Sequence, residues 1–257
     1  MQQSLFIIVP TYNEKDNIYQ LIDETARTMS QYPDYICNIL VVDDNSPDGT
    51  AQIVKNNMPI LQEKYYNLRL HMLQREGKMG LGTAYIAGFK YALQNNADFI
   101  MEMDADFSHQ PKYVPTFLDF AKNYDVVIGS RYVRGGGIEN WSPIRKIISR
   151  GGGIYARLIL GMNIQDLTGG YNLFRRNVLQ SINLDKVKSN GYSFQIEIKY
   201  RCFKKGFKIR EIPIIFPDRV NGKSKMNKKI FLEAIKMVWN IKFDKSITSK
   251  DQKSKLS

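Results

Sequence analysis

Apolar runs that alternate with helix-forming stretches constrain the fold of this 257-residue chain more than any other feature. The run LFIIV at residues 5–9 ends at Pro10, and Ile18, Leu21 and Ile22 then follow at helical spacing. Similar runs lie at 38–43, 68–73, 98–104 and 125–130, and helices are predicted to begin near Thr50, Thr83 and Pro111. Because strands buried on both faces read as continuous apolar runs, the pattern predicts an α/β fold with a mostly parallel sheet flanked by helices.

The part of the chain after Ser130 lacks this regularity. GGGIENW and SRGGG, flanked by Arg131, Arg134, Arg145 and Arg150, are expected to be cationic, mobile loops that suit an anionic ligand. A helix near 193–204, a strand at 211–216 and an amphipathic helix at 230–241 complete the pattern. We expect a single domain over 1–242, with a nucleotide and metal half at about 1–130 and an acceptor half at 131–242, followed by a disordered basic tail at 243–257.

Composition and motif content exclude several classes of protein. The 37 Lys and Arg against 25 Asp and Glu give a formal charge of +12, which favours anionic partners such as phosphates, nucleic acid or an anionic membrane. Cys37 and Cys202 lack metal-ligand spacing, so a reducing, cytosolic environment fits them best. No run approaches the roughly 18 to 20 apolar residues of a spanning helix, so a soluble or peripheral protein is expected. Phosphate-loop and nucleophile-elbow motifs are absent from the sequence.

Polar residues follow three of the predicted strands. VPTYNE comes after the first, VVDDNSPDGT continues the second and EMDADFSH continues the fourth. The carboxyl ends of parallel strands border the ligand crevice of an open sheet. One acidic turn of this kind is more often only a solvated turn, but three on separate strands predict a ligand site.

Asp104 and Asp106 are the most informative pair among these residues. Carboxylates at i and i+2 on extended backbone point to one side, where they can share a cation. Mg²⁺ and Mn²⁺ take one or two carboxylates and leave positions for water and substrate phosphates. We therefore expect a divalent metal at Asp104 and Asp106.

Several blocks of the sequence, in their order, resemble the inverting nucleotide-sugar glycosyltransferases of the GT-A type, and more narrowly the dolichyl-phosphate mannose synthases. The blocks are VPTYNE, VVDDNSPDGT, GLGTAY, MDADFSH, GSRYV, TGGYNLFRR and FPDRVNGKSKM, and the resemblance spans about residues 4–241. It implies a GT-A fold with a Rossmann-like sheet, and metal-dependent, inverting transfer of mannose from GDP-mannose to dolichyl phosphate. The product would be a lipid-linked mannose donor for glycosylation and GPI-anchor assembly.

The resemblance also implies a role for each matching residue. The donor nucleotide would be held by Pro10, Tyr12, Glu14, Asp43, Asp44 and Ala105, and its diphosphate by Arg219 and Lys225. The metal would be Mn²⁺ or Mg²⁺ on Asp104 and Asp106, and the acceptor phosphate would meet Arg131, Arg145 and Ser149. Asp104, Asp106 and Arg131 would be the catalytic residues. A phosphomonoester acceptor, with a second pKa of about 6, is already anionic near neutral pH and needs no strong general base.

Two other functions remain open at this stage. The first is glucosyl transfer from UDP-glucose to the same lipid. The second is a non-catalytic protein that binds polyprenyl phosphate or nucleic acid, although acidic clusters in the predicted crevice argue against nucleic acid. Enzyme turnover would separate the two.

Lysines surround the predicted helix at 230–241, whose apolar face either closes the core or meets a membrane. They are Lys223, Lys225, Lys228, Lys229, Lys236, Lys242 and Lys245. Each lysine near an anionic leaflet contributes about 1 kcal/mol of attraction. Peripheral attachment at the cytosolic face of the endoplasmic reticulum is expected, either directly or through the small membrane-anchored partner that the resemblance implies.

Overall fold

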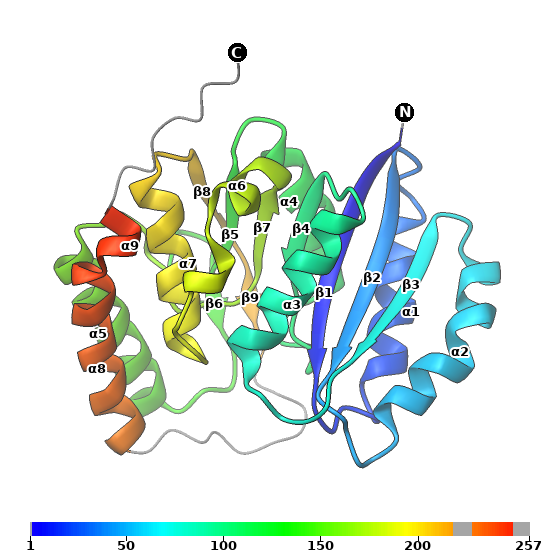
Figure 1. The fold of residues 1–257 in the computed structure, drawn as a ribbon, viewed down its shortest axis with the longest axis horizontal. Helices are drawn as coiled ribbons and strands as arrows, with labels where there is room; N and C mark the ends of the chain where they lie inside the picture. Colours follow the sequence, from blue (N-terminus) through cyan, green and yellow to red (C-terminus); the bar gives the residue numbers. More distant parts are fainter. Residues whose placement is uncertain (1, 218–227, 249–257) are drawn as a thin grey trace.

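A computed structural model of the protein describes residues 2–217 and 228–248, with side chains for 2–217 and 236–247. Its centre is a seven-stranded sheet in the order β3-β2-β1-β4-β7-β5-β8, covered by helices on both faces (Figure 1). Only β7 runs antiparallel to its neighbours β4 and β5. The strands are β1 (Gln3–Thr11), β2 (Tyr35–Asp43), β3 (Leu68–Gln74), β4 (Phe99–Glu102), β5 (Val126–Ser130), β7 (Asn172–Arg175) and β8 (Ile209–Pro213). A small parallel sheet pairs β6 (Gly137–Ile138) with β9 (Ile215–Phe216).

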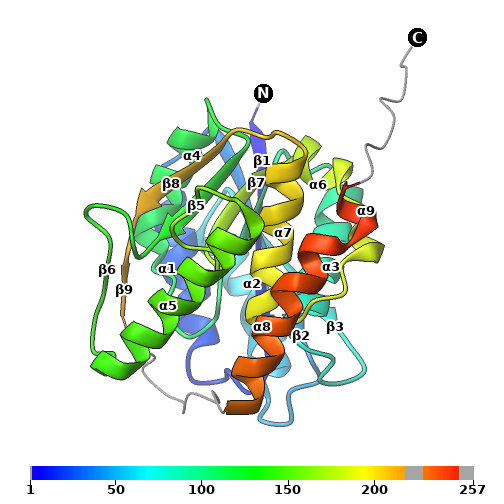
Figure 2. The same cartoon turned by 90° about the vertical axis from the view of Figure 1, so that its left-hand side faces the viewer.

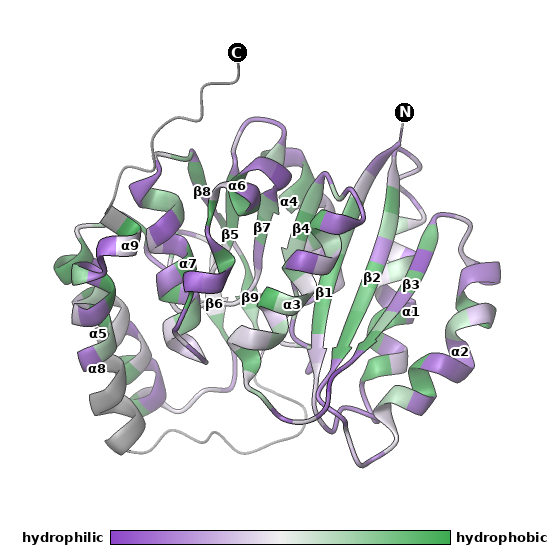
Figure 3. Ribbon diagram, viewed as in Figure 1, coloured by the Kyte–Doolittle hydropathy of each residue, from purple (hydrophilic) through white to green (hydrophobic). Residues whose placement is uncertain are grey.

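Alternation along the central strands divides the core into two clusters. On β1, Leu5, Ile7 and Val9 belong to one cluster, whereas Phe6 and Ile8 belong to the other, and this is the two-residue period of a strand buried on both faces. The strands are accordingly coloured hydrophobic along most of their length in Figure 3. The helices on the first face are α1 (Ile18–Met29), α2 (Thr50–Lys64) and α4 (Val114–Ala121). Those on the second are α3 (Leu81–Gln94), α6 (Arg176–Ser181) and α7 (Tyr192–Lys204).

The predicted alternation is confirmed up to Ser130, with one change at the end of β4. The strand expected over 98–104 ends at Glu102, and residues 105 and 106 form a turn. Asp106 lies in this turn, so the two aspartates do not share one extended strand, and the geometric reason given for their pairing was wrong.

The expectation of mobile loops after Ser130 is wrong for SRGGG. Residues 143–160 form α5 (Pro143–Leu160), with Gly151, Gly152 and Gly153 inside the helix. Both ends of α5 are capped in the usual way. At the start, the Ser142 hydroxyl accepts a hydrogen bond from the Arg145 N–H, and at the end, Gly161 adopts a left-handed φ of 69°. Each glycine costs about 1 kcal/mol of helix propensity relative to alanine, and tertiary packing outweighs that cost here.

The C-terminal helix is confirmed as α8 (Lys228–Phe243), and a short helix, α9 (Lys245–Thr248), follows it. Val238 and Ile241 are buried with the second core cluster, so this part of the apolar face does close the core. The tail expected from residue 243 is helical at 245–248, because Ile247 is also buried and the Asp244 carboxylate accepts a hydrogen bond from the Ser246 N–H at 2.8 Å. Residues 249–257 lie outside the described residues. None of the described helices is long and apolar enough to cross a membrane.

Candidate functional site

The carboxyl ends of β2, β1 and β4 lie side by side, and the chain leaves each through a turn with left-handed backbone. The residues with positive φ are Asn13 at 62°, Asn45 at 55° and Phe107 at 61°. Asparagine adopts this conformation readily, whereas for a bulky aromatic residue such as Phe107 it is uncommon. Strain of this kind collects at functional sites, where surrounding contacts hold it in place. The predicted crevice therefore starts from three constrained turns.

Asp43 and Asp44 are held tightly by groups of the protein. Asp43 is fully buried, and its carboxylate accepts hydrogen bonds from the Thr11 hydroxyl at 2.8 Å and from the Ser46 hydroxyl and N–H at 2.6 and 2.9 Å. Asp44 accepts from Arg75 Nε at 2.6 Å and from the Met79 N–H at 3.2 Å. Both carboxylates thus organise the turn after β2. Arg75 did not emerge from the sequence analysis, because its ion pair spans 31 positions.

The turn after β1 leaves Tyr12 at the surface, 37% exposed, with Lys78 Nζ 4.1 Å from its ring centroid. Glu14 is half-buried: its N–H donates to the Thr50 hydroxyl at 3.0 Å, and its carboxylate accepts from Asn17 at 2.9 Å. Pro10 pairs with Val42 in the sheet register. Tyr12 therefore offers a partly exposed ring in the turn after β1.

Asp104 and Asp106 occupy the turn after β4 in different surroundings. The Asp104 side chain is 26% exposed and accepts a hydrogen bond from the Tyr85 hydroxyl at 2.8 Å. Asp106 is buried and accepts from the Ser108 hydroxyl and N–H at 2.5 and 3.1 Å. Burial, and then the Asp104 charge, raise the pKa of Tyr85 well above its ordinary value, so the phenol stays protonated and donates. Ala105 between them is buried in the core.

His109 supports this turn and connects it to the other half of the crevice. Its Nδ1 accepts a hydrogen bond from the Asp104 N–H at 2.8 Å, which places the ring proton on Nε2. Burial lowers the pKa of His109, although the charges of Asp104 and Asp106 oppose that shift, and Arg131 lowers it further. The Phe216 ring centroid lies 5.7 Å from the His109 ring and 5.2 Å from the Arg131 guanidinium, so His109 connects the turn of the aspartate pair to the surroundings of Arg131.

The two carboxylates suit a metal shared with a substrate, not a metal held by protein alone. Among the described residues, no group of three or more His, Cys, Asp or Glu side chains gathers around one point. Asp104 is partly exposed, and a hard divalent ion can take two carboxylates while phosphate oxygens and water fill its other positions. The donor set thus fits Mg²⁺ or Mn²⁺ on a bound diphosphate.

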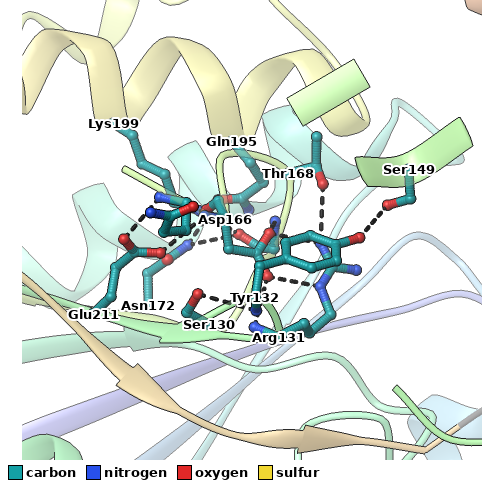
Figure 4. Close-up of polar contacts among 12 residues, drawn as sticks. Ser130, Arg131, Tyr132, Ser149, Asp166, Thr168, Asn172, Gln195, Lys199 and Glu211 are labelled. Atoms are coloured by element: carbon teal, nitrogen blue, oxygen red, sulfur yellow. Dashed lines mark hydrogen bonds and ion pairs between the residues drawn. The ribbon is translucent and has the colours of Figure 1, made fainter. Parts of the chain in front are cut away.

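Arg131 lies at the end of β5, almost fully buried, in a forked ion pair with Asp166 (Figure 4). Arg131 Nε and Nη2 donate to the two carboxylate oxygens, both at 2.7 Å, and Nη2 also donates to the Thr168 hydroxyl at 2.9 Å. Burial alone would raise the pKa of Asp166, but the Arg131 charge outweighs it and holds the pKa at about 2. Arg131 is therefore a fixed cation, already oriented by the protein.

The three residues expected at an acceptor phosphate, Arg131, Arg145 and Ser149, all contact the side chain of Tyr132 or Trp141. The Arg131 guanidinium lies 5.3 Å from the Tyr132 centroid and 5.7 Å from the Trp141 centroid, and the Arg145 guanidinium lies 3.7 Å from Trp141. The hydroxyls of Tyr132 and Ser149 share a hydrogen bond of 2.7 Å (Figure 4). The structure thus brings Arg131, from the end of β5, beside Arg145 and Ser149 on α5.

A buried polar network beneath both halves was missed by sequence reasoning. Lys199 on α7 is fully buried and donates to the carbonyls of Asp166 and Gly169 at 2.8 and 2.7 Å. Asn172 donates to Glu102 at 2.5 Å, at the end of β4. Burial raises the pKa of Glu102, although the hydrogen bond from Asn172 and the charge of Lys199 oppose that shift. Burial lowers the pKa of Lys199, although the charges of Asp166 and Glu102 oppose it. The available indication was α7 itself, whose polar residues alternate with apolar ones and leave no polar face.

Arg219 and Lys225, assigned to the donor diphosphate, lie outside the described residues.

Comparison with known proteins assigns the chain to a family. Residues 6–182, more than half of the chain, match the model of glycosyl transferase family 2. The chain belongs to glycosyl transferase family 2. Membership makes the protein a glycosyltransferase, which disfavours the non-catalytic alternatives.

Two bacterial relatives can be aligned with nearly the whole length of this chain. An undecaprenyl-phosphate mannosyltransferase from Micrococcus luteus is 41% identical over 230 residues, 89% of this chain and 89% of the relative. A polyprenol monophosphomannose synthase from Mycolicibacterium smegmatis is 39% identical over 243 residues, 93% of this chain and 88% of the relative. The family predicted from the sequence blocks is thereby confirmed.

Solved structures of other glycosyltransferases share the fold of this family 2 chain. Glucosyl-3-phosphoglycerate synthase from Mycobacterium tuberculosis, in complex with phosphoglyceric acid, matches with a TM-score of 0.63 at 16% identity, over 93% of this chain and 80% of the other. The same enzyme with Mn²⁺, UDP and glucosyl-3-phosphoglycerate matches with a TM-score of 0.59 at 16% identity, over 93% and 78%. The predicted GT-A fold is confirmed.

Proposed function

We propose that this glycosyltransferase moves mannose from GDP-mannose to a polyprenyl phosphate, with inversion at the anomeric carbon and with Mn²⁺ or Mg²⁺. One observation carries the proposal: the turn of the aspartate pair and Arg131 are connected through His109 and Phe216. His109 Nδ1 accepts a hydrogen bond from the Asp104 N–H at 2.8 Å, and the Phe216 ring centroid lies 5.7 Å from the His109 ring and 5.2 Å from the Arg131 guanidinium. The names of the two bacterial relatives support mannose as the sugar and a polyprenyl phosphate as the acceptor.

The donor side follows from the turns after β1, β2 and β4. Tyr12 offers a ring to the nucleoside, and Asp43 and Asp44 hold the turn beside it. Asp104 and Asp106 would hold the metal, with Ala105 between them. When bound, a divalent ion supplies charge that stabilises the departing diphosphate. Tyr85 and His109 keep the Asp104 carboxylate and backbone in place.

The acceptor side follows from β5 and α5. Arg131 is fixed by Asp166, so its position costs no reorganisation when a phosphate arrives. Arg145 and Ser149 would complete the phosphate site beside it. Because the acceptor phosphate is already anionic, the residues need only bring it against the sugar and need not remove a proton.

The lipid and the location remain predictions from the sequence resemblance. Dolichyl phosphate, and peripheral work at the cytosolic face of the endoplasmic reticulum with or without a small membrane-anchored partner, are what that resemblance implies. The relatives are named for undecaprenyl phosphate and polyprenol, and both are bacterial. A test must therefore compare lipids as well as sugars.

The decisive experiment incubates the purified full chain with Mn²⁺ or Mg²⁺, one donor and one short-chain polyprenyl phosphate, and detects glycolipid by mass spectrometry. Donors are GDP-mannose, GDP-glucose and UDP-glucose; acceptors are the dolichyl and undecaprenyl forms. We expect mannolipid from GDP-mannose, and none when EDTA removes the metal. The proposal would be refuted if UDP-glucose were the one donor that gave glycolipid, or if none of the three donors gave any.

A further inference from the structure

The segment at residues 165–169, which carries Asp166, contains neither helix nor strand. Its backbone polar groups need partners from elsewhere, because a buried N–H or carbonyl without a partner costs free energy. Glu211 on β8 accepts hydrogen bonds from the Gln165 and Asp166 N–H groups at 2.7 and 2.8 Å. Lys199 on α7 donates to the Asp166 and Gly169 carbonyls at 2.8 and 2.7 Å. Two side chains from different elements thus hold the segment, one through its N–H groups and the other through its carbonyls (Figure 4).

Lys199 is a costly residue for this task. Its side chain is fully buried on α7, which is in contact with α8 and lies beside it in Figure 2. Lysine is among the residues least often fully buried, because the ammonium group loses its hydration. In return, its charge-assisted hydrogen bonds are roughly twice as strong as those of a neutral donor. A buried lysine therefore holds two carbonyls in place more firmly than an amide or a hydroxyl would.

The group that this segment positions is the carboxylate of Asp166. It accepts hydrogen bonds from the backbone N–H groups of Arg131 and Gly169, both at 2.9 Å, and from the Arg131 guanidinium in two bonds of 2.7 Å. Two parallel bonds fix the plane of a guanidinium as well as its place. A shift or tilt of the 165–169 segment would therefore move the Arg131 side chain with it.

The ion pair leaves one nitrogen of Arg131 for a ligand. Nε and Nη2 donate to Asp166, and Nη2 also donates to Thr168, whereas Nη1 takes part in no hydrogen bond among the described residues. The plane fixed by Asp166 also sets the direction of Nη1. A phosphate that binds there depends on that direction, and a misplacement of about 1 Å can lower a rate by about a hundredfold.

We propose that Lys199 is a positioning residue for the acceptor phosphate. Its bonds to the Asp166 and Gly169 carbonyls set the place of the Asp166 carboxylate, and through that carboxylate the place of Arg131. The inference rests on the proposed function, because that function assigns Arg131 to the acceptor. The position of Arg131 is nevertheless a property of the chain without substrate, so it can be measured independently of turnover.

The test compares two variants that each remove a buried cation from α7. Lys199→Met keeps the length of the side chain and removes both bonds to the segment. Arg201→Met is the matched control, since Arg201 is also buried and donates to a backbone carbonyl, that of Lys186, but makes no hydrogen bond to residues 165–169 among those described. Both variants should lower the denaturant midpoint, so stability alone does not separate them.

The first measurement is the Nε–H signal of Arg131 in the arginine side-chain NMR spectrum of the full chain without substrate, assigned by its loss in Arg131→Lys. We expect Lys199→Met to shift this signal and to speed its hydrogen exchange by about tenfold or more, because the group that fixes Arg131 is loosened. Arg201→Met should leave the signal in place. An Arg131 signal that is the same in Lys199→Met as in the wild type would overturn the positioning role.

The second measurement is steady-state kinetics with a short-chain polyprenyl phosphate. In Lys199→Met, kcat/KM for this acceptor should fall about 10- to 100-fold, while metal-dependent GDP binding changes little. Equal losses in Lys199→Met and Arg201→Met would reduce Lys199 to a structural residue and overturn the proposal. A wild type that transfers no sugar would refute the proposed function, and the Arg131 signal would still decide the positioning.

A second variant covers the case in which Lys199→Met does not fold. Glu211 is only half-buried, and Glu211→Gln removes one of its two bonds to the segment, because an amide nitrogen accepts no hydrogen bond. We expect the Arg131 signal to shift in this variant as well, since the same segment is loosened from its other partner. An unchanged signal would show that the segment does not position Arg131.

Discussion

The proposed donor region, at the turns after β1, β2 and β4, and the proposed acceptor region, around Arg131, are built in different ways. Around the donor turns, contacts within one turn stand beside longer ones: Asp43 binds Ser46 three positions away and Asp106 binds Ser108 two positions away, whereas the Asp44–Arg75 ion pair spans 31 positions. Around the acceptor, Arg131 binds Asp166 across 35 positions, and Lys199 reaches the Asp166 carbonyl across 33. The donor side is thus a set of strand-end turns, whereas the acceptor side is a tertiary frame. Substitutions should accordingly affect ligand binding first in the donor half and stability first beneath the acceptor half.

The largest expected effect is on the donor side. Asp106→Asn removes a charge from the pair expected to hold the metal, while the amide oxygen can still accept the hydrogen bonds of Ser108. We expect metal-dependent GDP binding to be lost and turnover to fall by roughly a hundredfold to a thousandfold, as when a charge-stabilising group is removed. Calorimetry with GDP and Mn²⁺ measures the first effect, and steady-state kinetics the second.

Asp185→Asn is the control, because that carboxylate is 78% exposed in a surface ion pair with Lys90. It should change neither quantity. Unaltered metal-dependent GDP binding in Asp106→Asn would show that the metal lies elsewhere. The thermal midpoint of Asp106→Asn should stay near that of the wild type, as the comparison of the two halves requires.

Asp166→Asn should act on stability instead. It leaves Arg131 charged and buried without its carboxylate, and breaking a buried ion pair in this way costs about 3 to 5 kcal/mol. We expect a clear fall in the denaturant midpoint. Replacing both charged residues by apolar ones, in the double variant Arg131→Met/Asp166→Leu, should recover much of that stability without recovering activity. A variant as stable as the wild type would contradict the idea of a tertiary frame.

The same ion pair predicts how stability depends on pH. The folded pKa of Asp166, about 2, lies below its unfolded value of 3.8, so its contribution is complete above pH 3.8 and is lost as pH falls through 2. At 1.36 kcal/mol per pKa unit, that contribution is about 2 kcal/mol. The difference in unfolding free energy between the wild type and Asp166→Asn should therefore shrink between pH 4 and pH 2. A difference that stays constant over this range would mean that the carboxylate is not stabilised by Arg131.

The elements before Ser130 could be predicted from the sequence much better than those after it. The reason is again that local patterns report local contacts and leave out distant ones. The runs at 5–9 and 38–43 are confirmed as strands because central strands are buried on both faces, which fixes their composition. The acidic turns after them are confirmed as neighbours because parallel strands end at one edge. Helix α5 was missed because Gly151, Gly152 and Gly153 have poor helix propensity, and only packing against the core compensates for it.

The acceptor network shows what local patterns leave out. Arg131 and Arg145 stand out in the sequence as cations beside glycine-rich stretches, but their acceptor role, like that of Ser149, comes from the resemblance. Their convergence around Tyr132 and Trp141 is visible only in three dimensions. Asp166 and Lys199 had no local pattern, since a buried charge is recognised by its partner and the partner is distant. A helix such as α7, with polar residues on every side, is the one sequence feature that predicts buried polar contacts.

A smaller effect is expected for Arg145→Ala, at the edge of the acceptor site. Its guanidinium packs on Trp141, and a charge-assisted hydrogen bond to phosphate contributes about 1.5 to 3 kcal/mol. We expect kcat/KM for the lipid phosphate to fall about 10- to 150-fold with little change in the KM for GDP-mannose. Arg157→Ala, on the same helix but bound to Gln165, is the control. A loss that appears mainly in GDP-mannose binding would assign Arg145 to the donor half.

The smallest predicted effect tests whether the long-range frame reaches the acceptor itself. Tyr132→Phe keeps the ring beside Arg131 but removes the hydroxyl bonded to Ser149, which joins the end of β5 to α5. A net hydrogen bond contributes about 0.5 to 1.5 kcal/mol, so kcat/KM for the lipid phosphate should fall about 2- to 13-fold. The KM for GDP-mannose and the unfolding midpoint should hardly move, because no donor-side contact involves this hydroxyl among the described hydrogen bonds. Tyr19→Phe, at an exposed tyrosine of α1, controls for the loss of a phenol.

If Ser149→Ala gives the same loss and the double variant Tyr132→Phe/Ser149→Ala loses no more, the two hydroxyls act as one unit. Additive losses would mean that Ser149 acts without Tyr132, and the acceptor half would then depend less on distant contacts than its buried ion pair suggests.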